Sequence, residues 1–214
     1  MSGLRCLRSA GIAALVAVGP ALIGQQAEAA LCSTTDVTLT IGASLYNPIS
    51  CADNVAQGGG PTAETNSLNT QLGTSFVYLD KSDDTGTPTG LGGVTFVVTA
   101  SSGNSGTWTV AWTDVAGLPN LPLVLDLDVG LFGGNNASGY LFSSVLLPIS
   151  PSSGSGTFDI NFLNNGEEQP TLSHLLLAGG NVGTPTNVPE PATLGLLGIG
   201  LATLGWLRRR KATT

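Results

Sequence analysis

Hydrophobic and polar residues alternate along most of the central part of the chain. Trp108, Val110 and Trp112 occupy every second position, and polar or small residues separate them. Successive side chains of a strand point to opposite faces, so this alternation predicts strands with one apolar face. The same pattern, bounded by Gly, Pro, Asn and Ser clusters, predicts strands at 36–41, 75–80, 93–100, 107–113, 121–129, 140–148, 157–162 and 172–178.

Strands with one apolar and one polar face are typical of antiparallel sheets that stack on a shared core. The expected fold is therefore all-β, an antiparallel β-sandwich of jelly-roll type formed by residues 30–178. The segment 52–66, which contains three consecutive glycines, is expected to be a long flexible loop, and 81–92 a second loop. A flexible linker is expected at 179–187.

The N-terminal 29 residues have the features of a secretory signal peptide. Arg5 and Arg8 give a positive start, 10–24 is apolar, and Ala27 and Ala29 form a small-x-small cleavage site. We therefore expect signal peptidase to cleave after Ala29.

The last part of the chain has a different composition from the rest. Val188-Pro189-Glu190-Pro191 precedes an uncharged apolar run at 192–207, and Arg208-Arg209-Arg210-Lys211 follows it. As a helix, the apolar run would be about 24 Å long. That length is marginal for a hydrocarbon core of about 30 Å, and its glycines disfavour a buried helix of a soluble core. The basic cluster predicts a membrane stop on the cytoplasmic side, with the body outside the cytoplasm.

These three elements, in this order, resemble the PEP-CTERM domain, a C-terminal sorting signal of Gram-negative bacteria. The resemblance covers residues 188–211. It implies that the helix anchors the chain transiently in the inner membrane and that exosortase recognises and processes the tail. The protein would then reach the cell envelope or the extracellular space.

The charge of the body excludes one large class of partner. Between the two terminal segments, Lys81 is the only basic residue beside twelve carboxylates, which gives a formal net charge of −11. No basic patch can form, so nucleic acid and anionic lipid are not expected partners.

Two cysteines, Cys32 and Cys51, remain after removal of the signal peptide. An exported protein meets an oxidising compartment, so a disulfide between them is expected. A metal site is the alternative, but two distant cysteines and one histidine are a poor zinc ligand set. Lipidation of Cys32 is not expected, because Leu31 precedes it where that peptidase needs a small residue.

Few residues suggest catalysis. His174 is the single histidine, and no Gly-x-Ser-x-Gly sequence accompanies it, so a structural role is expected. Asp126 and Asp128 share a strand face about 7 Å apart. They could serve glycoside hydrolysis or bind Ca²⁺, although a solvated strand face is the simpler interpretation.

Two further groups of side chains admit a functional interpretation. Asp80, Asp83 and Asp84 form a second oxygen-rich segment, but their spacing does not match an EF-hand. The aromatic residues could form a sugar-binding surface, although core packing is the expected role of the tryptophans; they are Tyr78, Trp108, Trp112 and Tyr140. No catalytic residue, metal site or cofactor is therefore expected.

The leading hypothesis is a non-enzymatic, exosortase-processed protein of the envelope or extracellular matrix, associated with biofilm exopolysaccharide. A carbohydrate-binding module is the main alternative. A polysaccharide hydrolase is a less favoured one. Ice binding is another, because ice-binding proteins can bear this tail and Thr107, Thr109 and Thr113 share one face.

Overall fold

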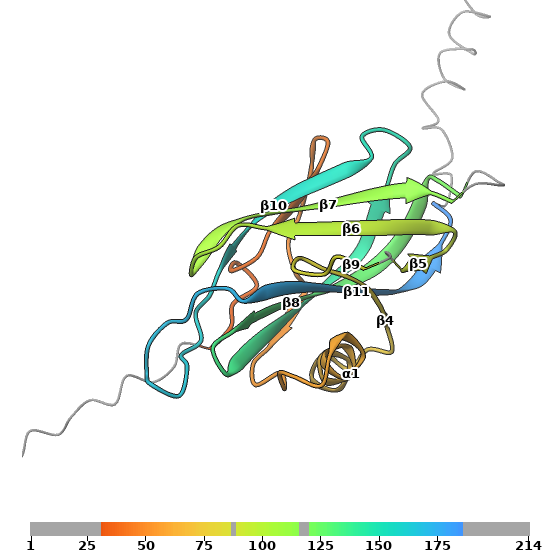
Figure 1. The fold of residues 1–214 in the computed structure, drawn as a ribbon. Coiled ribbons are helices and arrows are strands. Elements are labelled where there is room, and N and C mark those ends of the chain that lie inside the picture. The colour runs from red at the N-terminus through yellow and green to blue at the C-terminus, as the bar shows by residue number, and fades with distance from the viewer. Residues whose placement is uncertain (1–30, 87–88, 116–119, 186–214) are drawn as a thin grey trace, which may run out of the picture.

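The computed structural model describes residues 31–86, 89–115 and 120–185 as two stacked antiparallel sheets (Figure 1). The all-β prediction with two antiparallel sheets is confirmed. The expected signal peptide and the expected membrane helix at 192–207 lie outside the described residues. Within the described ranges, no helix has the length and apolar character that crossing a membrane requires.

The two sheets contain six and five strands. The first has the order β2 (Ser44–Tyr46), β1 (Leu39–Ile41), β10 (Ser153–Asp159), β7 (Ser105–Asp114), β6 (Val94–Ala100) and β5 (Gly90–Leu91). The second has the order β3 (Ser50–Ala52), β9 (Asn136–Leu147), β8 (Leu123–Gly133), β11 (His174–Gly183) and β4 (Val77–Lys81).

The main core lies between the sheets and follows the predicted alternation. On β7, Trp108 and Trp112 are only 1% and 2% exposed, and the threonines between and beside them face solvent. Both indole N–H groups are paired, because Trp108 donates to the carbonyl of Thr38 at 3.0 Å and Trp112 to that of Pro148 at 3.1 Å. The tryptophans are therefore core residues, as expected, and present no stacking surface to a sugar.

Helix α1 (Pro61–Leu72) corrects the prediction that 52–66 is a flexible loop. Pro61 starts the helix with a backbone angle already suited to it. The helix ends at Gly73, whose φ of 72° lies in the left-handed region that glycine adopts without strain. Figure 1 shows α1 on the outer side of the five-stranded sheet, away from the other sheet.

The helix and the outer face of that sheet enclose a second, smaller core. Its buried members come from the helix, its flanking segments and three strands; they are Val55, Leu68, Phe76, Phe132, Ala137, Leu176 and Ala178. Gly130 on β8 and Gly139 on β9 pair directly across the sheet beneath Leu68. A Cβ atom on Gly139 would lie 2.6 Å from a Leu68 methyl, so these two glycines form a trough that admits the leucine.

Strand β11 corrects the predicted linker. It continues through Gly179 and Gly180 to Gly183, pairing with β8 on one side, and Gly179 also pairs with β4. The Phe76 ring packs so closely over Gly180 that an added Cβ would lie 2.4 Å from it. The folded body therefore extends beyond residue 178, and positions 186–187 of the predicted linker lie outside the described residues.

Candidate functional site

The predicted sorting residues have no described geometry. The signal-cleavage residues Ala27 and Ala29, the segment Val188–Pro191 and the basic cluster 208–211 all lie outside the described residues. The sites that can be built from geometry are therefore those of the body.

The first cluster holds the beginning of the described chain to the sandwich. Cys32 and Cys51 are joined in the structure, with their Cα atoms 6.1 Å apart, which ties the N-terminal segment to β3. Asp53 reinforces the link, because it accepts the Cys32 N–H at 2.8 Å and the Ser138 hydroxyl at 2.7 Å. The arrangement is a structural tether.

Asp36 is a second structural carboxylate at the same end of the chain. It is buried and accepts hydrogen bonds from the Tyr140 hydroxyl at 3.1 Å and from the Asn161 side chain at 2.7 Å. Burial and the neighbouring Asp36 carboxylate raise the pKa of Tyr140 far above its usual value. Tyr140 is therefore a neutral hydrogen-bond donor of the core.

His174 lies beneath α1, a helix that the hydrophobic pattern did not predict. Its Nε2 is 3.1 Å from Oε2 of Glu64 on the helix, and its ring stacks on Phe132 with centroids 4.6 Å apart. Burial lowers the pKa of His174 and outweighs the opposing effect of Glu64. The other Glu64 oxygen accepts the N–H of Gly58 at 3.2 Å. The pair therefore couples the helix to β11, and both of its side chains are buried.

Asp126 and Asp128 share the outer face of β8, but the predicted solvated face is wrong for Asp128. Asp128 is 0% exposed, because the turn after α1 covers it, and its Oδ2 lies 2.6 Å from the Thr74 hydroxyl. Burial raises its pKa to about 7, and the nearby Asp126 carboxylate adds to this effect.

Asp126 remains partly exposed and well paired. It accepts the Ser144 N–H at 2.7 Å and the Asn181 side-chain amide at 2.8 Å. Although its partial burial raises the pKa, these hydrogen bonds outweigh that effect and the pKa is lowered. Two carboxylates with separated pKa values are a feature of glycosidases. Here, however, Asp128 is sealed from any substrate that could reach Asp126.

Asp126 also lines a hollow of about 340 Å³ at the end of α1. Thr74, Phe76 and Asn181 contribute to its walls. The hollow is therefore bounded by the turn that covers Asp128.

The three carboxylates at the end of β4 have separate partners. Asp80 is buried and accepts the Val98 N–H at 2.6 Å, while Asp84 accepts the Tyr78 hydroxyl at 2.9 Å. Asp83 lies 3.3 Å from the Lys81 ammonium. In the part of the chain that the structure describes, no group of three or more His, Cys, Asp or Glu side chains is placed to hold a metal ion.

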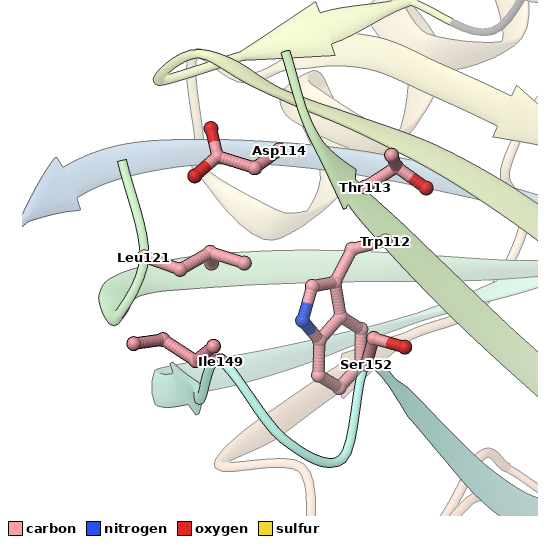
Figure 2. Close-up of a pocket in the computed structure, with 6 residues that line it drawn as sticks. All are labelled: Trp112, Thr113, Asp114, Leu121, Ile149 and Ser152. Carbon is pink, nitrogen blue, oxygen red and sulfur yellow. The ribbon is translucent and has the colours of Figure 1, made fainter. Parts of the chain in front are cut away.

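A cavity of about 290 Å³ opens at one end of the sandwich (Figure 2). Its walls come from the end of β7, the segment before β8 and the connection from β9 to β10; the lining residues are Trp112, Thr113, Asp114, Leu121, Ile149 and Ser152. Asp114 accepts two hydrogen bonds from Asn120, which lower its pKa. The cavity is thus largely apolar, and its one carboxylate, Asp114, has a pKa that favours the ionised form.

The outer face of the six-stranded sheet is rich in hydroxyl groups. Thr40, Ser155 and Thr109 pair in register across three strands, and Thr109 pairs onward with Thr99. The hydroxyls of Thr99 and Thr109 are 2.7 Å apart. A shallow hollow of about 470 Å³ lies on this face, lined in part by Thr40, Thr109 and Ser155.

Comparison with known proteins identifies only the tail. The PEP-CTERM protein-sorting motif matches residues 187–211, which confirms the resemblance. The motif implies an exported protein that exosortase processes, with a C-terminal membrane-anchoring sorting signal. No curated protein and no solved structure matches the chain.

Proposed function

We propose that this chain is a non-enzymatic protein of the cell envelope or extracellular matrix, released by exosortase and associated with exopolysaccharide. The observation that carries the proposal is the sorting motif at 187–211, which follows a body with its own hydrophobic core. Signal peptidase acts on the N-terminal end and exosortase on the C-terminal end.

The burial and hydrogen bonding of the candidate catalytic side chains support a non-enzymatic body. A general base must reach the proton that it removes. His174 and Asp128 are buried and bound to residues of the same chain, and Asp80 caps a backbone N–H of β6. These groups stabilise the fold instead of facing a substrate.

The sorting step follows from the chemistry of Pro189, Glu190 and Pro191. Proline fixes its own backbone angle and biases the residue before it towards extended conformations. The three residues are expected to keep the segment extended next to the apolar run, where a membrane enzyme can bind it. Glu190 supplies one negative charge for a basic group of that enzyme.

Intact-mass analysis in a host with and without exosortase tests the sorting. We expect secreted protein that lacks residues 1–29 and the apolar tail, and membrane-bound chain in the strain without the enzyme. Alanine at Pro189, Glu190 and Pro191 should leave the chain unprocessed. Alanine at positions 184–186 is the matched control and should be processed normally. Normal release of the first variant would contradict the proposed recognition.

A separate assay tests the role of the body. Loss of the protein should weaken biofilm or floc cohesion, and the purified mature protein should sediment with native exopolysaccharide without degrading it. Release of reducing sugar ends by the purified protein would instead identify an enzyme.

Ice binding is a second candidate, favoured by the hydroxyl-rich outer face of the six-stranded sheet. Neighbouring strands are about 4.8 Å apart and alternate residues about 6.8 Å apart, so the threonines form a two-dimensional array. Thermal hysteresis of the mature protein tests it. Thr109→Lys, in the middle of the array, should abolish the activity, and Thr85→Lys, on an exposed loop, should retain it. Absence of hysteresis in the unmodified protein would exclude this candidate.

A further inference from the structure

The hydroxyl of Thr74 has two acceptors and one proton. Its Oγ1 lies 2.7 Å from Oδ1 of Asn69 and 2.6 Å from Oδ2 of Asp128. A threonine hydroxyl donates one hydrogen bond and accepts others. Thr74 can therefore donate in only one of the two contacts, and in the other contact the partner residue must supply the proton.

The orientation of Asn69 decides which contact that is. Its Oδ1 accepts the N–H of Phe76 at 2.9 Å, and its Nδ2 donates to the carbonyl of Phe76 at 2.9 Å. A reversed amide would oppose donor to donor and acceptor to acceptor, so Oδ1 is the oxygen. An amide oxygen has no proton to give, and Thr74 must donate to it. The proton between Thr74 and Asp128 consequently belongs to the Asp128 carboxyl group.

The surroundings of Asp128 agree with a neutral acid. Its side chain is fully buried, and Oδ1 has no hydrogen-bond partner among the described residues. Burying an ionised carboxylate with one unpaired oxygen costs free energy, whereas a neutral carboxylic acid needs fewer hydrogen bonds. Its neighbours in register are Ala178 on β11 and Leu141 on β9.

Among the residues that the structure describes, no cationic side chain on the elements packed on this face compensates Asp128. Asp126, on the same strand, disfavours a second negative charge, and burial raises the pKa of Asp128 to about 7. The other titratable groups of these elements have partners of their own; they are Glu64 with His174, Asp80 with Val98, Lys81 with Asp83, Tyr78 with Asp84, and Tyr140 with Asp36.

We propose that Asp128 is a protonated latch that holds the turn 73–76 and the end of α1 on the five-stranded sheet. The acid donates to Thr74, Thr74 donates to Asn69, and Asn69 fixes the backbone of Phe76. Loss of the Asp128 proton replaces a hydrogen bond with a buried charge and so releases the turn. Because Thr74 and Phe76 also line the hollow beside Asp126, its release widens that hollow as the pH rises.

Carboxyl NMR of the unmodified mature protein is the direct test. We expect one aspartate carboxyl to titrate near neutral pH, and Asp128→Asn should remove that signal. A carboxyl of Asp128 already ionised at pH 5 would overturn the proposal. The titration itself is measured on the unmodified protein and does not depend on whether a variant folds.

Hydrogen exchange of the Phe76 amide tests the release itself. If the open turn restores an ordinary aspartate pKa, the opening equilibrium should rise about 100-fold between pH 5 and pH 9, after correction for intrinsic exchange. Asparagine at position 128 can donate to Thr74 without ionising, so Asp128→Asn should remove most of this rise. Asp126→Asn is the matched control and should keep most of it, because burial is the largest cause of the raised Asp128 pKa. Equal pH dependence in the unmodified protein and Asp128→Asn would contradict a latch at this residue.

Discussion

Leu68 is the residue through which α1 is expected to contribute most to stability. Its side chain is fully buried above Gly130 and Gly139, and Leu68→Ala would remove the three outer carbons from that trough. Buried leucine-to-alanine changes cost about 2–5 kcal/mol, depending on how far the surroundings collapse. The glycines have no side chains that could move into the space. We therefore expect a loss of about 3 kcal/mol in the free energy of unfolding.

Urea denaturation of the oxidised mature protein at pH 6, followed by fluorescence of the buried tryptophans, measures this loss. A change of about 3 kcal/mol corresponds to a melting temperature lower by roughly 6–12 °C for a domain of this size. Leu45→Ala is the control, because Leu45 is 62% exposed on β2 and should change stability by less than about 0.5 kcal/mol. A loss below about 1 kcal/mol for Leu68→Ala, with an unchanged denaturant slope, would refute the docking of α1 through this trough.

Two further predictions concern the tethers of the body. Non-reducing peptide mapping should recover Cys32 and Cys51 in one linked peptide, and replacing both with serine should lower stability by on the order of 3 kcal/mol; two free thiols in exported protein would contradict the link. His174→Ala should cost roughly 2 kcal/mol, because it removes the ring on Phe132 and leaves a buried Glu64 oxygen without its partner. At matched folded abundance, however, any activity in a biofilm or floc assay should persist, and its loss with an unchanged melting temperature would make His174 a functional residue. Because the pKa of His174 is lowered, its contribution to stability is complete above about pH 6.5 and declines as the pH falls below that value.

The alternation of side chains predicted the sandwich well because its strands bury one face in a common core. Helix α1 could not be predicted in this way, because Leu68 and Leu72 are the only large apolar residues in it. It docks through the two glycines beneath it, and a glycine gives no apolar signal in the sequence.

The sequence-based predictions for Asp128 and for the linker were wrong because they did not include helix α1. The face of β8 that was expected to be solvated is covered at Asp128 by α1 and the turn that follows it. The glycines at 179–183 suggested a linker by composition. In the folded protein, Gly180 is instead where a strand passes closely beneath Phe76.

The four edge strands have a consequence for contacts between copies of this chain. β2, β5 and β3 contain 3, 2 and 3 residues, and β4, the longest edge, contains 5 and ends in Lys81. The interior strands β8 and β9 contain 11 and 12 residues. Short edges and an edge lysine offer few contiguous backbone groups to a neighbouring chain. Copies of this chain at high concentration are therefore protected from joining sheet to sheet into fibres, and contacts between the described parts of two copies are expected to use the side-chain faces of the sandwich.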